Sequence, residues 1–452
     1  MPGCWSCHGD ALTHDEHLAA EAELVEFGLD WWHSTRPNHD GARVTWAATD
    51  VPLTSVSAAP CIHTLEYTSG TPESGVPALV MIHGFGFGAA LYYAAAPPLA
   101  TEWPGRVFSI DQLGCGLSSR PPWPYPRGHR CPVSVAEAYF VDAIEAWRAA
   151  LSLDTDHASC GHSIGGYIAA AYAERHPERV RQLVLASPAG VPHPPEGLAE
   201  VHAKAPRVLK LVRSLVQRGW SPMLLTRDLG MGRRLLTNYM SRRFGDEQPW
   251  IAKPLLLNYL LGIWCRSPKS AGGYMVQALM AVGGIPKGSQ GEFVYARHPL
   301  AERLLALVKI VPRVSLIYGE FDWINWRNGA DVALAQQAQP GGRRGGRAHR
   351  RVAGGAGHTS AHDRQPSRLC RRSPLGHPGR GQSRRRPGHG AVRRRIRTAL
   401  RRSRKDFQAC HRCEAAARRG LHRDLGARAV PVEPPLDVLS SCIWGGTVKL
   451  TD

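Results

Sequence analysis

The sequence lacks any uninterrupted run of about 18 apolar residues, the length that a membrane-spanning helix requires. Its first residues also lack the basic region and the apolar run of a secretory signal peptide. Both absences predict a cytoplasmic protein without a membrane-spanning helix. Apolar residues make up 43% of the 452 residues and aromatic residues 8%, which excludes disorder of the whole chain.

Acidic residues are almost missing from residues 341–420, which hold 24 Lys and Arg but 3 Asp and Glu. Residues 1–340 hold 29 basic and 30 acidic residues, so the net charge of +19 originates in the tail. Phe407 is the one aromatic residue between 341 and 420, which leaves no platform on which bases could stack. We therefore expect no specific nucleic-acid binding. A disordered extension, a gene read in the wrong frame and a non-specific nucleic-acid arm are alternative interpretations of the tail.

The 11 cysteines do not form a disulfide framework. Cys4, Cys7 and His8 match the CxxCH pattern of haem attachment, and Cys410 and Cys413 form a second CxxC. A zinc site needs two such pairs close in space, and these pairs lie about 400 residues apart in the sequence. We expect free thiols here, with no metal and no haem.

Short apolar runs alternate with helical patterns between about residues 77 and 313, which is typical of a parallel sheet with helices on both faces. A helix is predicted at 135–151, where apolar residues recur at helical spacing. Buried parallel strands are predicted at 78–82, 107–110, 183–186 and 314–318. The fold class is therefore α/β.

Changes of composition divide the chain into an N-terminal segment, a core in two parts, an inserted cap and a tail. The cap is helix-like, with no clear strand, and its apolar residues either line a cleft for an acyl chain or pack the cap on the core. The expected bounds are 1–60 for the N-terminal segment, 61–195 and 299–366 for the core, 196–298 for the helical cap, and 367–452 for the basic, disordered tail.

Residues 161–165 read Gly161-His-Ser163-Ile-Gly165, a G-x-S-x-G pentapeptide. In such an elbow the serine occupies a sharp, strained turn between a strand and a helix, and the glycines let neighbouring backbone approach closely. A helix of small residues follows at 166–174. Ser163 is therefore the predicted nucleophile, and a chance match in a loop is the alternative.

A glycine-rich turn, residues 83–88, directly follows the predicted strand at 78–82. Backbone N–H groups in such a turn can stabilise an oxyanion, and we assign this role to Phe85 together with Ile164. A plain turn between strand and helix is the alternative. The turn lacks the Lys-Ser/Thr pair of a phosphate-binding P-loop.

Asp322 follows the predicted strand at 314–318, where a carboxylate can orient a histidine. His358 lies in Gly-Ala-Gly-His and also forms an H-x4-D pattern with Asp363. The chain order Ser163, Asp322, His358 is the order of the catalytic triad in α/β hydrolases.

These motifs resemble the α/β-hydrolase fold family, in the branch of the lysophosphatidic acid acyltransferases and the coactivator of lipid-droplet triglyceride lipase. The resemblance implies an α/β-hydrolase fold with an inserted cap, a nucleophile elbow at Ser163 and an acyltransferase motif at His358 and Asp363. The coactivators have Asn in place of the nucleophile, so Ser163 favours a catalytic member. The similar segments are 83–93, 109–123, 140–154, 161–180, 185–196, 295–304, 318–325 and 355–366.

The expected function is that of a serine-dependent acyl hydrolase or acyltransferase on glycerolipids or lysophospholipids, with no cofactor and with acyl-CoA as an optional co-substrate. Direct acyl transfer by His358 and Asp363 without Ser163 is one alternative, and a small-molecule carboxylesterase is another. A third is a non-catalytic coactivator of a separate lipase on a lipid droplet or membrane. In that case Phe27, Trp31 and Trp32 would anchor the chain, although these rings equally suit packing within the protein.

Overall fold

The computed structural model describes residues 13–35, 43–56, 58–123, 125, 131–153, 157–194, 196, 232–243, 251–266, 271–282, 294–319, 324–337 and 448–451, with a few single positions between 207 and 223. They all belong to one compact unit formed by Met1–Ala353 and Pro431–Asp452. Among them, no helix has the length and apolar character to cross a membrane.

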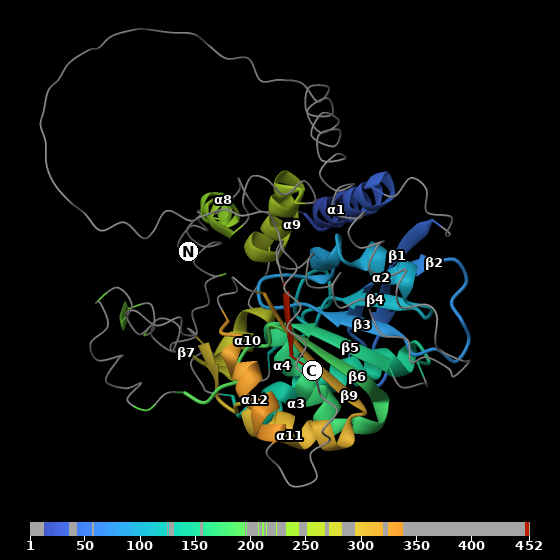
Figure 1. Ribbon diagram of the computed structural model, residues 1–452. Helices are drawn as coiled ribbons and strands as arrows, with labels where there is room; N and C mark the ends of the chain where they lie inside the picture. Colours follow the sequence, from blue (N-terminus) through green and yellow to red (C-terminus); the bar gives the residue numbers. More distant parts are fainter. Residues whose placement is uncertain are drawn as a thin grey trace, which may run out of the picture. The chain divides into compact units, whose positions relative to one another are not determined.

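The described residues form a central sheet with the strand order β1-β2-β4-β3-β5-β6-β9-β10 (Figure 1). The strands from β4 to β9 in this order are parallel, while β1, β2 and β10 are antiparallel to their neighbours at the two edges. The strands are β1 (Val44–Pro52), β2 (Cys61–Ser69), β3 (Leu79–Ile82), β4 (Val107–Ile110), β5 (His157–His162), β6 (Val180–Ala186), β9 (Arg313–Gly319) and β10 (Val448–Thr451). The strands predicted from the sequence correspond to β3, β4, β6 and β9.

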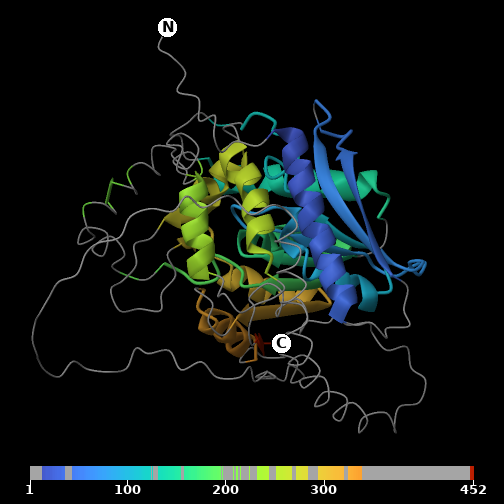
Figure 2. The same cartoon turned by 90° about the horizontal axis from the view of Figure 1, so that it is seen from above.

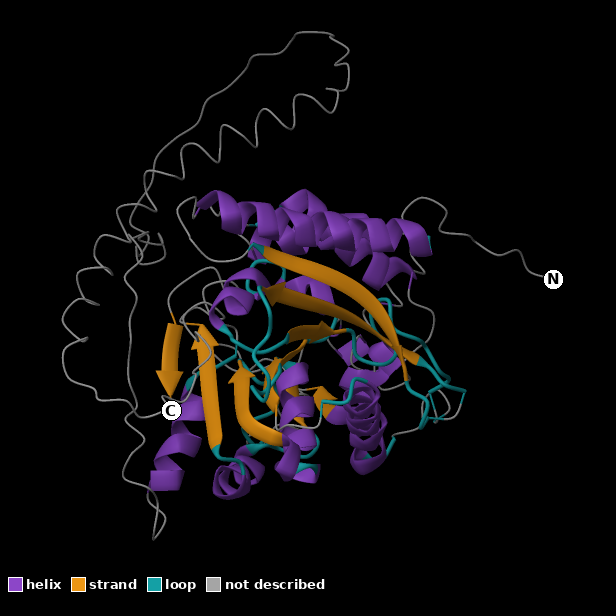
Figure 3. Ribbon diagram, turned by 90° about the vertical axis from the view of Figure 1, so that its right-hand side faces the viewer, coloured by secondary structure: helices purple, strands orange, loops and turns teal. Residues whose placement is uncertain are grey.

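Helices cover both faces of the sheet, as Figure 3 shows. Side chains alternate along β3, so that Leu79 and Met81 pack in the cluster of α1 and α9, and Val80 and Ile82 in the cluster of α3 and α4. This confirms the predicted α/β class. The helices are α1 (His14–Thr35), η1 (Ala89–Tyr92), α2 (Ala96–Glu102), α3 (Val133–Ala150), α4 (Ile164–Arg175), η2 (Pro177–Arg179), α8 (Gly232–Arg243), α9 (Lys253–Arg266), α10 (Ala271–Leu279), α11 (Ala301–Ile310) and α12 (Arg327–Gln337).

The predicted cap contains α8, α9 and α10, and Figure 2 shows α8, α9 and α1 side by side. Its described part is not wholly helical, because β7 (Met280–Val282) pairs antiparallel with β8 (Val294–Ala296). The expectation of no strand at 196–298 was therefore wrong at these two places. Each strand has three residues, too few for an alternating pattern to show in the sequence.

The apolar residues of α9 pack the cap on the core. Leu256, Leu260, Leu261 and Ile263 are each at most 2% exposed and lie in the same cluster as sheet residues such as Met81. The packing interpretation of the cap's apolar residues thus holds for these four. They are not available to line a cleft.

The N-terminal segment expected at 1–60 joins the core, because β1 pairs with β2 along its whole length. Between Val44 and Val51 no residue of β1 is buried, so its sequence shows no apolar alternation. Trp31 and Trp32 on α1 are 9% and 7% exposed. These two rings pack within the protein, which excludes them as the surface anchor that the coactivator interpretation requires.

The tail expected to be disordered at 367–452 includes β10 at its far end. Val448–Thr451 pairs antiparallel with β9, from Val448 opposite Gly319 to Thr451 opposite Leu316. Val448 and Leu450 alternate with Lys449 and Thr451, a pattern compatible with an edge strand. The expectation of disorder is therefore wrong for these four residues, and residues 367–447 lie outside the described part.

A buried histidine ties α1 to the sheet. His63 on β2 contacts Glu21 Oε1 of α1 through Nε2 and Asp50 Oδ1 of β1 through Nδ1, both at 2.7 Å. Burial alone lowers the pKa of His63, but the hydrogen bond and charge of Glu21, the charge of Asp111 and the hydrogen bond to Asp50 raise this pKa to about 10. His63 is therefore protonated at neutral pH, and its charge opposes the burial that raises the pKa of Glu21.

Candidate active site

Ser163 lies between the end of β5 and the start of α4, at φ 56° and ψ −121°. A side chain other than glycine rarely adopts a positive φ, so the surrounding backbone must hold this conformation. The Ser163 N–H donates to the Ala186 carbonyl at 3.0 Å, and the Ser163 carbonyl accepts from the N–H groups of Gly166 and Ala189, each at 3.0 Å. The predicted elbow is thus a strained turn fixed by β6 and by the segment that follows it.

Steric crowding explains why glycine occupies positions 161 and 165 of the elbow. A Cβ on Gly161 would lie 2.6 Å from Gly166 Cα, and one on Gly165 would overlap the carbonyl oxygens of Ile82 and His83. No side chain fits at either position without a shift of backbone. The absence of these side chains lets α4 start directly against β3 and β5.

The loop of residues 83–88, here called the oxyanion loop, passes directly beside Ser163. A Cβ on Gly84 would lie 3.0 Å from Ser163 Cβ, and Gly86 turns the loop at φ 78°. Among the residues that the structure describes, neither the Phe85 N–H nor the Ile164 N–H donates to a backbone or side-chain acceptor. Among the described residues, these two backbone donors thus have no acceptor, and they lie at the positions predicted to form an oxyanion hole.

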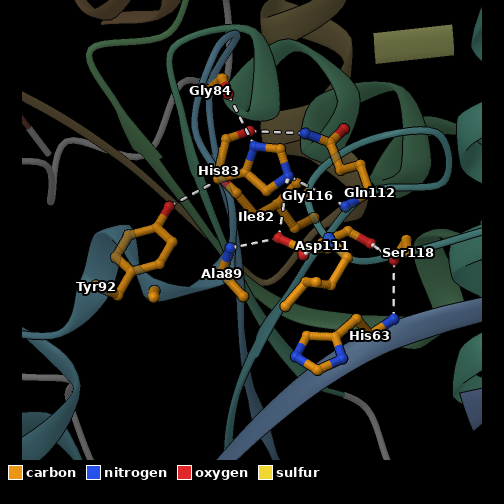
Figure 4. A network of polar contacts seen from close by, with 12 residues as sticks. His63, Ile82, His83, Gly84, Ala89, Tyr92, Asp111, Gln112, Gly116 and Ser118 are labelled. Carbon is orange, nitrogen blue, oxygen red and sulfur yellow. Dashed lines mark hydrogen bonds and ion pairs between the residues drawn. The ribbon is translucent and has the colours of Figure 1, made fainter. Parts of the chain in front are cut away.

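His83 holds the beginning of the oxyanion loop (Figure 4). Its Nδ1–H donates to the Gly84 carbonyl at 2.8 Å, and its Nε2 accepts from the Gln112 N–H at 3.1 Å. The Gln112 side-chain amide donates to the His83 carbonyl at 2.7 Å. Burial lowers the pKa of His83, which keeps the ring in the neutral tautomer that both of its contacts require.

Asp111, directly after the adjacent strand β4, holds Ala89, the residue that follows the oxyanion loop (Figure 4). Its Oδ1 accepts from the Ala89 N–H and its Oδ2 from the Leu117 N–H, each at 2.6 Å. The residue is fully buried, and a Cβ on Gly116 would overlap the carboxylate. Asp111 is not among the residues predicted from the sequence. Its position directly after the predicted strand at 107–110 could have identified it, because this is the same end of the parallel sheet as Ser163.

Replacing Asp111 with asparagine is expected to lower the free energy of unfolding by about 2–3 kcal/mol, because an amide accepts through one atom only and leaves one buried N–H without an acceptor. Urea denaturation measures this loss. Asp142→Asn is the matched control, since its 2.9 Å ion pair with Arg175 is half exposed and contributes little. An Asp111 variant as stable as the wild type would contradict the role of this carboxylate.

The remaining predicted site residues, Asp322, His358 and Asp363, lie outside the described residues. The structure thus brings together Ser163 and the oxyanion loop. β9 ends at Gly319, three residues before Asp322, and runs parallel to β6. Within the described ranges, no three His, Cys, Asp or Glu side chains are grouped so that they could hold a metal ion.

Comparison with known proteins identifies relatives of the chain. A model of the alpha/beta hydrolase fold family matches residues 77–233. The chain is 32% identical over 340 residues to a protein of Oryza sativa subsp. japonica named "Probable 1-acylglycerol-3-phosphate O-acyltransferase", which covers 72% of this chain and 74% of that protein.

Two further relatives are animal proteins. The (Lyso)-N-acylphosphatidylethanolamine lipase of Mus musculus is 32% identical over 261 residues, 57% of this chain and 68% of that protein. The 1-acylglycerol-3-phosphate O-acyltransferase ABHD5 of Rattus norvegicus is 41% identical over 118 residues, 26% of this chain and 31% of that protein. The resemblance drawn from the sequence motifs is thus confirmed, and the chain belongs to the alpha/beta hydrolase fold family.

Proposed function

We propose that the chain is a serine-dependent acyl hydrolase or O-acyltransferase that acts on glycerolipids or lysophospholipids. The observation that carries this proposal is the strained Ser163 beside an oxyanion loop, with the Phe85 and Ile164 N–H groups unused among the described residues. The relatives are named as 1-acylglycerol-3-phosphate O-acyltransferases and as a (lyso)-N-acylphosphatidylethanolamine lipase, and these names support a lipid as the substrate class.

In this mechanism His358 removes the proton from Ser163 as its Oγ attacks the carbonyl carbon of an ester or thioester. Asp322 orients His358 and stabilises its protonated form. The N–H groups of Phe85 and Ile164 stabilise the negative charge on the carbonyl oxygen, with help from the N-terminus of α4. When the C–O or C–S bond breaks, His358 returns the proton to the leaving alcohol or thiol, and the acyl group stays on Ser163.

The acyl-enzyme then reacts with a second hydroxyl group. Water gives hydrolysis and a free fatty acid, whereas the hydroxyl of a lysophospholipid gives acyl transfer. In both cases His358 removes the proton of the attacking hydroxyl and returns it to Ser163 Oγ as the bond between the acyl group and Ser163 breaks. Exclusion of water and the local concentration of the acceptor decide between the two. These steps use no metal or other cofactor, and acyl-CoA enters as an acyl donor. Transfer by His358 and Asp363 without Ser163 is the competing route.

A lipid substrate is presented at a surface, so the proposal includes a cytoplasmic protein that binds peripherally to membranes or lipid droplets. A separate lipase as partner belongs to the coactivator alternative. That alternative has no nucleophile to use, whereas this chain has Ser163 in the strained elbow conformation. The catalytic function is therefore the one that the geometry supports best.

A long acyl chain is expected to be preferred over a short one. The half-buried aromatic rings of Phe85, Phe87 and Trp264 lie on or against the oxyanion loop and offer apolar contact to a chain attached at Ser163. Burial of a methylene contributes about 0.8 kcal/mol, so kcat/KM should rise about fourfold for each methylene that is buried. The measurement is kcat/KM on p-nitrophenyl esters from C2 to C16, followed by phosphatidic acid formation from lysophosphatidic acid and oleoyl-CoA.

Protein with Ser163→Ala gives the background rate of ester hydrolysis. A profile that peaks at C2–C4, with no hydrolysis of or transfer to a lipid, would contradict the lipid assignment and identify a small-molecule carboxylesterase. Hydrolysis of lysophospholipid without transfer from oleoyl-CoA would assign a lipase, and the reverse an acyltransferase.

A further inference from the structure

The cap reaches the oxyanion loop through one tryptophan of α9. The indole Nε1–H of Trp264 donates to the Gly86 carbonyl at 2.8 Å, and the Trp264 ring meets the Phe85 ring edge to face, with centroids 6.0 Å apart. A Cβ on Gly86 would lie 2.6 Å from Trp264 Cζ2. The indole therefore lies directly on the loop, where glycine leaves the space for it.

Two hydrogen bonds in series let Trp264 influence the direction in which the Phe85 N–H points. The Gly86 carbonyl, which Trp264 holds, shares a rigid peptide plane with the Phe87 N–H. The Phe87 N–H in turn donates to the Gly84 carbonyl at 3.3 Å. The Gly84 carbonyl and the Phe85 N–H belong to one peptide plane, so fixing the direction of this carbonyl fixes the direction of the Phe85 N–H.

The Gly84 carbonyl has a second donor, His83 Nδ1–H, at 2.8 Å. His83 therefore holds this plane from the sheet side, while Trp264 holds it from the cap side through Phe87. The Phe87 bond is long for a backbone hydrogen bond, so it holds the Gly84 carbonyl only while the Phe87 N–H is itself fixed in direction. Loss of the Trp264 indole N–H leaves the Phe87 N–H without an anchor on the cap.

α9 is itself held from behind by α1. Gly262 leaves room for the His17 ring, because a Cβ there would overlap it, and the His17 ring packs 5.3 Å from the Tyr259 ring. The Tyr259 hydroxyl accepts from the Ala90 N–H at 3.3 Å. The helix that carries Trp264 is thus fixed on both sides.

We propose that Trp264 is a positioning residue for the acyl-transfer chemistry at Ser163: its indole N–H fixes the Gly86 peptide and, through Phe87, aims the Phe85 N–H at the oxyanion. This inference rests on the proposed function. It makes the cap helix α9 part of the apparatus that stabilises the transition state, and not just a cover. An oxyanion forms only during reaction, so the effect falls on kcat and leaves KM unchanged.

The test is Trp264→Phe, which keeps an aromatic ring against Phe85 but removes the N–H. We expect kcat for p-nitrophenyl butyrate to fall about tenfold, less than the loss of a whole oxyanion-hole donor, with KM within about twofold of the wild type. The inhibition constant of a trifluoromethyl ketone, whose adduct with Ser163 carries an oxyanion, should rise by the same factor as kcat/KM falls. Rates are expressed per active site, titrated to completion with a fluorophosphonate, so that unfolded protein does not count.

The matched control is Trp103→Phe. Its indole N–H also donates to a backbone carbonyl at 2.8 Å, that of Pro77, but it lies at the end of α2 and not on the oxyanion loop. This variant should keep the wild-type kcat and inhibition constant. Wild-type hydrolysis that depends on Ser163, together with an unchanged kcat in the Trp264 variant, would overturn this inference alone. No Ser163-dependent hydrolysis in the wild type would overturn the proposed function and this inference with it.

Discussion

Replacing Ser163 with alanine is expected to lower kcat for ester hydrolysis by roughly 10⁴- to 10⁶-fold, because the acyl-enzyme can no longer form. The elbow itself should persist, since the hydrogen bonds that hold Ser163 use its backbone N–H and carbonyl. The variant should therefore fold as the wild type does and fail to react with a fluorophosphonate. Steady-state kinetics on a p-nitrophenyl ester and covalent labelling measure the two effects.

Ser159→Ala is the matched control, because Ser159 lies on the same strand, β5, but is buried in the sheet and 1% exposed. Labelling should survive this change. Hydrolysis lost in the Ser163 variant with acyl transfer retained would favour the direct route through His358 and Asp363. A wild-type protein that neither hydrolyses esters nor reacts with the fluorophosphonate would favour the non-catalytic coactivator.

Strands that are buried on both faces could be predicted from the sequence. β3 and β4 read Leu-Val-Met-Ile and Val-Phe-Ser-Ile, and every one of these side chains is buried. β5 was not among the predicted strands because it reads His-Ala-Ser-Cys-Gly-His, although it lies in the middle of the sheet. Its Gly161 serves the close approach of α4, so packing outweighs strand propensity there. β1 escaped prediction for the opposite reason, since most of its side chains face solvent.

The same distinction separates the parts of the site. Ser163 and its two glycines could be predicted because the strained turn imposes residue types at three of five consecutive positions. The contact between Trp264 and Gly86 could not be predicted, because the two residues lie 178 positions apart. Nothing in the sequence of the cap distinguishes Trp264 from another large residue with a hydrogen-bond donor. The side chains of Asp111 and Gln112 bind backbone groups, which any residue type supplies, so their partners leave no pattern in the sequence. The roles of Asp322 and His358 stay predictions.

Replacing His63 with glutamine is expected to lower the free energy of unfolding by about 3–5 kcal/mol at pH 6, because Glu21 then stays buried without its cationic partner. Glu21 is 1% exposed and Asp50 is 58% exposed, so the loss comes mainly from the Glu21 contact. Urea denaturation of the wild type and of the variant between pH 6 and pH 10.5 measures the difference.

The difference should depend on pH in a definite direction. The pKa of His63 is raised from 6.5 to about 10 in the folded protein, so its contribution is complete below about pH 6.5 and is lost as the pH rises through about 10. The two proteins should therefore approach each other in stability toward pH 10.5. His193→Gln is the matched control, because His193 contacts Glu302 at 2.5 Å but both side chains are exposed, and its loss should change stability little. A gap between wild type and the His63 variant that stays constant from pH 6 to pH 10.5 would show that the contact of His63 with Glu21 does not involve a charged imidazole.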